Sequence, residues 1–187
     1  MIVLGIDPGS RRLGWGVVAR LGTRLVHVAH GVIFADEGGT FADRLVVIER
    51  ELVRVVRIHK PTHASVEGLF FAKDAQAASK LGHARGVALL VCAREHLPIA
   101  EYAPARVKRT VAGGGRADKH QVAQMIRAML GLGEAPPPDA ADALALAITH
   151  LARGPAMPLA EVVRLSAFSV AKRRPRGRFN GRKPWTV

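Results

Sequence analysis

Residues 2–10 are Ile-Val-Leu-Gly-Ile-Asp-Pro-Gly-Ser, an apolar run that stops at a turn-forming sequence. The run predicts a short buried strand, because apolar residues continue up to Asp7 and the turn then ends the extended segment. The stretches Leu13–Ala19 and Leu25–Ile33 are also rich in strand-forming residues and predict two further strands in antiparallel order. The chain therefore begins with a three-stranded β-meander.

After the meander, helices and strands alternate. Apolar side chains recur at helical spacing over Phe41–Ile58, and Thr62–Val66 predicts a strand that ends at Glu67. A long helix over Asp74–His96 and a short strand over Ile99–Tyr102 follow. This β-α-β-α-β order is typical of an α/β domain.

Two more helices are predicted before the composition of the chain changes. Asp118 and the glutamine three residues later form a capping-box sequence, which starts a helix that runs through Leu130. Asp139–Leu151 follows a proline run and is the last predicted helix. We expect residues 1–155 to form one domain, which suits a chain of 187 residues.

The charge balance points to a polyanionic partner. The chain holds 28 Lys and Arg against 15 Asp and Glu, a net charge of +13, while 49% hydrophobic residues allow a sizeable core. Residues 172–187 contain seven Lys or Arg and no acidic residue. We interpret residues 156–187 as a basic, disordered tail that binds polyanions, with nucleic acid as the first candidate partner. Removing residues 172–187 is expected to weaken DNA binding while leaving strand cleavage intact.

The chain shows no sign of secretion or membrane insertion. A single cysteine, Cys92, excludes an internal disulfide and multi-cysteine zinc sites, and it fits a reducing cytoplasm. The uncharged run over Gly86–Ala93 is far shorter than the roughly 20 residues of a membrane span. We therefore expect a cytoplasmic protein without a membrane partner.

Four carboxylates occupy positions that suit a metal site. Asp7 and Glu67 each end a predicted buried strand, while Asp139 and Asp142 lie three residues apart at the start of the last helix and share a face. Carboxylates brought together need cations, and hard oxygen ligands suit Mg²⁺ or Mn²⁺. Two such ions on a phosphodiester activate water and stabilise the leaving oxygen, so the hypothesis is metal-dependent phosphodiester hydrolysis.

Each of these residues also has a purely structural interpretation. Asp7 is followed by Pro-Gly and is an ordinary turn former. Asp139 can act as the N-cap of the last helix, and Asp142 in its first turn suits the helix dipole. Spacing alone leaves the metal site and the structural interpretation both open.

Several separate motifs resemble the RuvC family of Holliday-junction resolvases over residues 1 to about 152. Their order and spacing match those of the family, and together they are far more specific than a lone Asp-Pro-Gly. The motifs are Gly5-Ile6-Asp7-Pro8-Gly9, Leu13-Gly14-Trp15-Gly16, Glu67-Gly68-Leu69-Phe70, Lys80-Leu81-Gly82-His83-Ala84-Arg85-Gly86 and Asp139-Ala140-Ala141-Asp142-Ala143-Leu144-Ala145.

The resemblance implies a ribonuclease H-like fold, a mixed five-stranded sheet with helices on both faces, and a homodimer. It implies symmetric paired nicks in a four-way DNA junction during recombination and repair, and the RuvA and RuvB branch-migration proteins as partners. Asp7, Glu67, Asp139 and Asp142 then become the catalytic carboxylates that bind two Mg²⁺ ions, with Asp7 bridging them and Mn²⁺ able to substitute. In the family, the place of Asp139 can also hold histidine.

Basic and aromatic residues complete the site that the resemblance implies. Lys119 matches a lysine beside the active site, where it can hold the scissile phosphate or neutralise developing charge, and Phe70 lies where it can stack on an unpaired base. Solvated lysines and a loop covered by its own hydrophobic side chains are the structural alternatives. The expected DNA contacts are Phe70, Lys73, Lys80, Arg85, Lys108, Arg116 and Lys119.

Small residues recur every four positions in the long helix, at Ala78, Gly82 and Gly86. Glycine costs roughly 1 kcal/mol in a helix interior, so this stripe predicts close packing against another helix. The partner helix can belong to the same chain. Because the family uses this helix in its dimer interface, we expect a two-fold contact here.

Two other functions remain open from the sequence. Ribonuclease H-like folds also occur in RNA-processing nucleases, including YqgF-type proteins. A non-catalytic junction-binding protein is the other alternative, with the carboxylates acting only as caps and turns. The complete block from Glu67 to Gly86 favours the junction endonuclease, and metal-dependent cleavage distinguishes an enzyme from a binding protein.

Overall fold

The computed structural model describes residues 1–35, 39–68, 75–113 and 118–153. Its strands are β1 (Ile2–Asp7), β2 (Arg12–Leu21), β3 (Arg24–Phe34), β4 (His63–Glu67) and β5 (Ile99–Tyr102). Its helices are α1 (Phe41–His59), α2 (Ala75–Arg94), α3 (Pro104–Ala112), α4 (Lys119–Leu130) and α5 (Pro138–Leu151). Phe70, Lys73, Arg116 and the tail over residues 156–187 lie outside the described residues.

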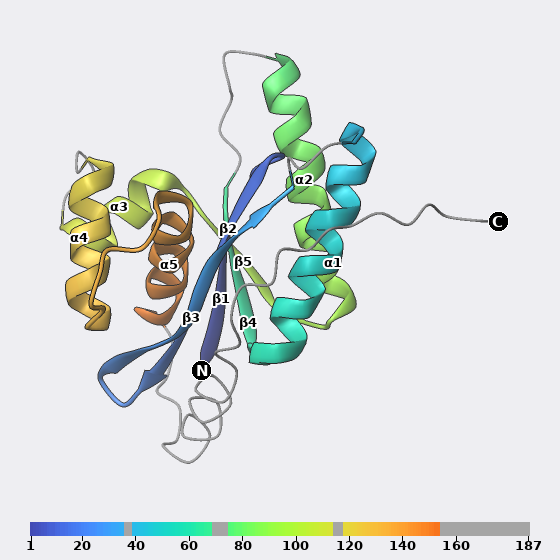
Figure 1. Cartoon of the computed structure of the whole chain (residues 1–187). Helices are drawn as coiled ribbons and strands as arrows, with labels where there is room; N and C mark the ends of the chain where they lie inside the picture. Colours follow the sequence, from blue (N-terminus) through green and yellow to red (C-terminus); the bar gives the residue numbers. More distant parts are fainter. Residues whose placement is uncertain (36–38, 69–74, 114–117, 154–187) are drawn as a thin grey trace.

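The five strands form one mixed sheet in the order β3-β2-β1-β4-β5. β1, β2 and β3 pair antiparallel, whereas β4 pairs parallel to β1 and β5 pairs parallel to β4. Figure 1 shows α1 and α2 on one face of the sheet and α3, α4 and α5 on the other. The predicted meander and the mixed sheet with helices on both faces are therefore confirmed.

α5 is the central helix of the fold, and ten of its 14 residues are buried. It lies unusually close to the sheet because two facing positions in the strands are glycine. A Cβ added at Gly5 would overlap the backbone carbonyl of Ala143, and one added at Gly14 would overlap that of Asp139. These glycines let the backbone of α5 rest on β1 and β2, which fixes where the carboxylates of α5 lie relative to the strand ends.

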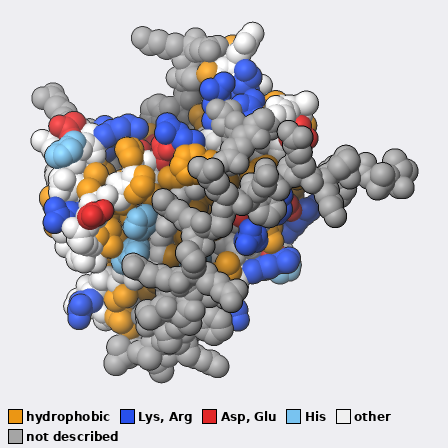
Figure 2. All heavy atoms as spheres, in the orientation of Figure 1, with side chains coloured by type: hydrophobic (Ala, Val, Ile, Leu, Met, Phe, Trp, Pro, Cys, Tyr) orange, Lys and Arg blue, Asp and Glu red, His pale blue; other side chains and the backbone are white. Residues whose placement is uncertain are grey.

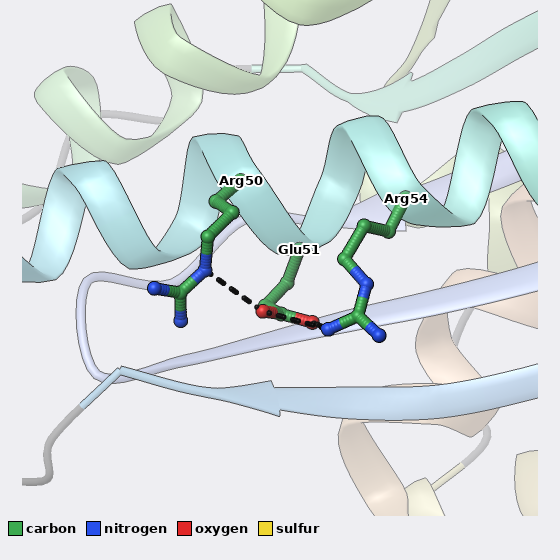
Figure 3. Close-up of polar contacts among 3 residues, drawn as sticks. All are labelled: Arg50, Glu51 and Arg54. Atoms are coloured by element: carbon green, nitrogen blue, oxygen red, sulfur yellow. Dashed lines mark hydrogen bonds and ion pairs between the residues drawn. The ribbon is translucent and has the colours of Figure 1, made fainter. Parts of the chain in front are cut away.

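α1 is the amphipathic helix that the periodicity predicted. Its buried face includes Ile48 and Leu52, and a capping box between Thr40 and Asp43 begins it. On its outer face, Glu51 forms ion pairs with Arg50 and Arg54, both at 3.0 Å (Figure 3). Exposed pairs of this kind contribute under about 1 kcal/mol, so burial of the apolar face holds the helix in place.

The predicted helices differ from those of the structure in three places. α3 was not predicted, although Pro104 occupies its first turn, a position that proline favours. α2 ends at Arg94 rather than His96, because His96 adopts a φ of 56°, which an α-helix does not contain.

The third difference concerns the carboxylates of the last helix. α5 begins at Pro138, so its N-cap is Pro137, and the interpretation of Asp139 as an N-cap is wrong. Asp142 also lies beyond the first turn, contrary to the interpretation through the helix dipole. Proline takes the start of the helix because its fixed φ already suits helical geometry and its missing N–H is not needed there. The residue in the first turn of α5, where the helix dipole favours a negative charge, is Asp139 rather than Asp142.

Candidate active site

Three of the four predicted carboxylates line one cavity of about 260 Å³. Asp7 is the last residue of β1, Glu67 is the last residue of β4, and Asp142 projects from α5. The walls are completed by residues of α3, α4 and α5, namely Pro104, Val107, Lys108, Lys119, Val122, Ala145 and Leu146. Asp7 and Asp142, which are 135 positions apart in the sequence, thus meet at one end of the sheet.

The topology explains this meeting. β1 and β4 are parallel neighbours, with Ile6 opposite Val66, so the residues that follow them, Asp7 and Glu67, end side by side. α5 packs over both strands and begins at the same end of the sheet (Figure 1). Open α/β sheets bind ligands at the carboxyl ends of their strands, and this cavity has that position.

Burial and mutual repulsion disturb the carboxyl groups of this cavity. Burial and, to a smaller extent, the nearby charges of Glu67, Asp142 and Asp139 together raise the pKa of Asp7 from 3.8 to about 7, while Lys119 acts in the opposite direction. Burial and Asp142 also raise the pKa of Glu67. A carboxyl group whose charge is this poorly compensated marks a site built to receive a cation.

Two cationic side chains accompany the carboxylates inside the cavity. The Nζ of Lys119 donates to Oδ2 of Asp142 at 3.4 Å, and the charge of Asp142 raises the pKa of Lys119. Lys108 lines the same cavity from α3. The structure therefore brings together five of the predicted residues, Asp7, Glu67, Asp142, Lys108 and Lys119.

Asp139 lies at the edge of this group rather than in its wall. Its Oδ2 is 3.4 Å from Nε of Arg12, a residue at the start of β2 that sequence reasoning missed. The available signal was the alternation of side chains along β2, because Arg12 and Gly14 share the face that packs on α5. Without a structure, nothing in the sequence shows which helix covers that face.

Arg85 does not occupy the surface position expected of a DNA contact. It is only 8% exposed, its Nε donates to the carbonyl oxygen of Glu67 at 3.2 Å, and its Nη2 pairs with Oε2 of Glu101 at 2.6 Å. Its guanidinium lies between the end of β4 and β5, and a DNA contact by Arg85 stays a prediction. In this structure Arg85 binds the backbone of Glu67, one of the candidate catalytic residues.

The remaining predicted contacts lie on α2 or outside the described residues. Lys80 is exposed on α2, near the stripe of Ala78, Gly82 and Gly86. Within the described part of the chain, a Cβ added at Gly82 or Gly86 would meet nothing within 4 Å. The two glycines therefore do not serve close packing within the described fold.

Carboxylate oxygens are suitable ligands for a hard divalent cation, but in this structure the four carboxylates are not close enough together to bind one ion jointly. Among the described residues, no three His, Cys, Asp or Glu side chains are placed to share an ion. The donors are carboxylate oxygens whose mutual repulsion raises the pKa of Asp7, and a dication relieves such repulsion. Arg12 and Lys119 now pair with Asp139 and Asp142 and have room to release them, since Arg12 and Lys119 expose 63% and 75% of their side chains.

Figure 2 shows Lys and Arg side chains, acidic side chains and hydrophobic side chains next to one another at the upper edge of the molecule. This mixture is typical of a site that binds a polyanion while also holding carboxylates. In the part of the chain that is described, no helix is both long and apolar enough to cross a membrane.

Comparison with known proteins gives consistent matches over the same part of the chain. The family described as "Crossover junction endodeoxyribonuclease RuvC" matches residues 3–150. A protein of that name from Sorangium cellulosum is 64% identical over 151 residues, which are 81% of this chain and 84% of that protein. The one from Afipia carboxidovorans is 51% identical over 148 residues, or 79% of this chain and 86% of that protein.

A solved structure matches as well. The structure titled "T. thermophilus RuvC in complex with Holliday junction substrate" has a TM-score of 0.76 and 38% sequence identity to this chain. The match covers 81% of this chain and 93% of that one. The family match over residues 3–150 contains every residue of the cavity described above.

Proposed function

We propose that this chain, which belongs to the RuvC family of crossover junction endodeoxyribonucleases, cuts DNA with Asp7, Glu67, Asp139 and Asp142 as its metal-binding carboxylates. The chain is an endonuclease that resolves four-way Holliday junctions, and its cleavage consists of paired symmetric nicks. The observation that carries the assignment of residues is the shared cavity of Asp7, Glu67 and Asp142 with two lysines in its wall.

Mg²⁺ is the proposed cofactor, with two ions per active site and Mn²⁺ able to replace it. The bound cations supply an activated water and stabilise the oxygen that leaves the phosphorus. Asp7 would be the central donor to such ions, because it is buried and experiences the charges of all three other carboxylates. Glu67, Asp139 and Asp142 complete the oxygen donors around it.

The protein's cations orient the DNA phosphate at this site. Lys119 lies 3.4 Å from Asp142 at the mouth of the cavity and is three-quarters exposed, so it can move from that carboxylate to a phosphate oxygen. Lys108 lines the same cavity from α3. Positive groups fixed beside the scissile phosphate stabilise the negative charge that develops as the bond breaks.

DNA contacts further from the chemistry follow from position and charge. Lys80 is exposed on α2 and is proposed to contact a DNA arm. Phe70, Lys73 and Arg116 remain proposals for the same role from the resemblance, and residues 156–187 remain proposed as a basic tail beyond a domain over residues 1–155. These assignments share a long-range attraction to phosphate that salt weakens.

A homodimer is proposed, with α2 at its two-fold contact. Gly82 and Gly86 lie in one stripe with Ala78, and a Cβ added at either glycine would meet no described residue within 4 Å. Leu90, the next residue at the same spacing, is 47% exposed. A flat stripe that ends in an exposed leucine suits close packing with a second copy of the same helix. Two such chains carry two active sites, as paired nicks require. RuvA and RuvB are proposed partners, and the cytoplasm is the proposed location.

The test of this function is cleavage of an immobile four-way junction, a plain duplex and single-stranded RNA, each with and without Mg²⁺ or Mn²⁺. Wild-type protein is expected to give paired, metal-dependent nicks in the junction alone. Asp7→Asn is expected to bind the junction and to lose cleavage by at least about 1,000-fold, because it removes a metal-binding charge.

Glu51→Gln is the matched control, because it removes a carboxylate from the outer face of α1. It should cut at the wild-type rate. Tight junction binding without cleavage under either metal would instead indicate a non-catalytic junction-binding protein, and cleavage of RNA would indicate a processing nuclease.

A further inference from the structure

Phe34, the last residue of β3, is the most exposed large hydrophobic residue in the described part of the chain, at 60%. A single exposed hydrophobic side chain is common in soluble proteins and needs no explanation by itself. The position of Phe34 relative to the carboxylates is what gives its exposure meaning.

Phe34 lies on the same face of the sheet as the active site, one side chain away from it. It is paired directly with Arg12 across β2 and β3, and directly paired residues project from the same face with Cβ atoms about 5 Å apart. Arg12 is the residue whose Nε lies 3.4 Å from Asp139. A continuous row therefore runs from the carboxylate through Arg12 to the Phe34 ring.

Two exposed arginines lie beside Phe34. Arg12 is 63% exposed, and Arg11, whose carbonyl oxygen accepts a hydrogen bond from the Ala35 N–H beside Phe34, is also exposed. An apolar protein partner would require neighbouring apolar side chains around the ring. An aromatic ring beside guanidinium groups is instead the combination that binds unpaired nucleotides, with the ring on a base and the cations on phosphates.

We propose that Phe34 and Arg12 form a nucleotide-binding platform, in which Phe34 stacks on an unpaired base of the strand being cut and Arg12 contacts a phosphate next to the scissile one. The proposal rests on the function proposed above and adds a contact to it. Bases at the point where strands exchange lose a stacking neighbour, which makes them available to an aromatic side chain. A base in an intact duplex is not available in this way.

The platform predicts a selective loss of affinity for junctions. Stacking on one aromatic ring is worth about 1–3 kcal/mol, so Phe34→Ala should weaken junction binding by roughly 5- to 150-fold. Its affinity for a plain duplex of equal length should stay within about twofold of the wild-type value. Phe34→Trp should restore junction binding, while Arg12→Gln should weaken binding to both DNAs because a phosphate contact carries no preference for unpaired bases.

The experiment is a titration of each variant with an immobile four-way junction and with the duplex, in chelator so that no strand is cut. A 2-aminopurine base is placed in turn at each nucleotide next to the exchange point, and its fluorescence reports stacking. One position is expected to respond to wild-type protein and to Phe34→Trp, but not to Phe34→Ala. Val46→Ala is the matched control, because Val46 is 58% exposed on α1 and is assigned no role.

Two results separate the proposal from the function on which it rests. Equal junction affinity for Phe34→Ala and Val46→Ala, with wild-type protein still preferring the junction, would overturn the platform alone. A wild-type protein that bound the junction no better than the duplex would overturn the proposed function itself. Because Phe34 is an exposed residue, its variants should keep the wild-type free energy of unfolding, which excludes misfolding as the cause of a lost contact.

Discussion

The fold uses glycine in two places for opposite reasons. Beneath α5, Gly5 and Gly14 let two backbones touch, and a methyl group at either position would overlap a carbonyl oxygen of the helix. Along α2, Gly82 and Gly86 face open space, where a methyl group would meet nothing within 4 Å in the described structure. The first pair serves packing within the chain. The second pair, Gly82 and Gly86, lowers the stability of α2 and makes no compensating contact within the described part of the chain.

This difference distinguishes α5, which is positioned by packing within the chain, from α2, which is expected to pack against a second chain. α5 must be fixed closely, since a shift of about 1 Å in Asp142 relative to Asp7 would spoil a metal site. α2 carries the cost of two interior glycines, which are expected to be compensated only when a second copy packs against them. The predictions below test the two halves of this comparison.

The largest effect is expected at Gly5. Gly5→Ala forces its methyl group into the backbone carbonyl of Ala143, and neither backbone can move without disturbing the sheet or α5. We expect the free energy of unfolding to fall by about 3 kcal/mol or more, and junction cleavage to fall with it. Urea unfolding and a cleavage assay on the fraction that remains folded measure the two effects.

Gly16→Ala is the matched control for Gly5→Ala. Its methyl group would meet mainly the side chain of Leu144, which can change rotamer, so a loss of only about 1–2 kcal/mol is expected. If Gly5→Ala were no less stable than Gly16→Ala, close backbone packing would not be what places α5.

A smaller effect is expected for substitutions in α2. They should stabilise the monomer but weaken the dimer. Gly82→Ala or Gly86→Ala should stabilise the monomer by about 0.5–1 kcal/mol, because alanine is the better helix former. The same change should weaken the dimer, since the methyl group widens the gap between the packed helices. Unfolding at low protein concentration and sedimentation at high concentration separate these effects. A stabilised monomer with unchanged dimerisation would remove α2 from the proposed contact.

The sequence predicted the strands and most of the helices well, because the signals for both are local. The run that ends at Asp7, the capping box at Asp118 and the apolar periodicity of α1 each depend on neighbouring residues, and each is confirmed. α3 was missed because it has only nine residues, although Val107 and Val111 recur at helical spacing and are buried. Pro104 in its first turn also occurs in ordinary loops.

The acidic residues of the candidate site were predicted more completely than its basic residues. Asp7, Glu67 and Asp142 end up in one cavity as the motifs suggested. The basic residues were harder, because a solvated and a buried arginine look alike in a sequence. Arg85 is buried against Glu101, and Arg12 lies beside Asp139, and both placements depend on pairings between distant segments that no local pattern encodes.

The central claim is that the Asp7 carboxylate is buried at a cost in stability so that it can bind metal. The folded-state pKa of Asp7, about 7, lies above its ordinary value of 3.8. Protonation therefore favours the folded state, and the stability that the protonated group confers is present in full below pH 3.8 and is lost as the pH rises through 7. At pH 8 the ionised group should destabilise the metal-free fold by on the order of 4 kcal/mol.

The most direct measurement is the free energy of unfolding of wild-type protein and Asp7→Asn at pH 4 and pH 8, in chelator and in Mn²⁺. In chelator, Asp7→Asn should be more stable than wild type at pH 8, and the difference should shrink at pH 4. In Mn²⁺ at pH 8, wild-type protein should gain stability and the variant much less, because the ion binds only the folded carboxylates. A variant that is no more stable in chelator, and that gains as much from Mn²⁺ as the wild type, would contradict the account.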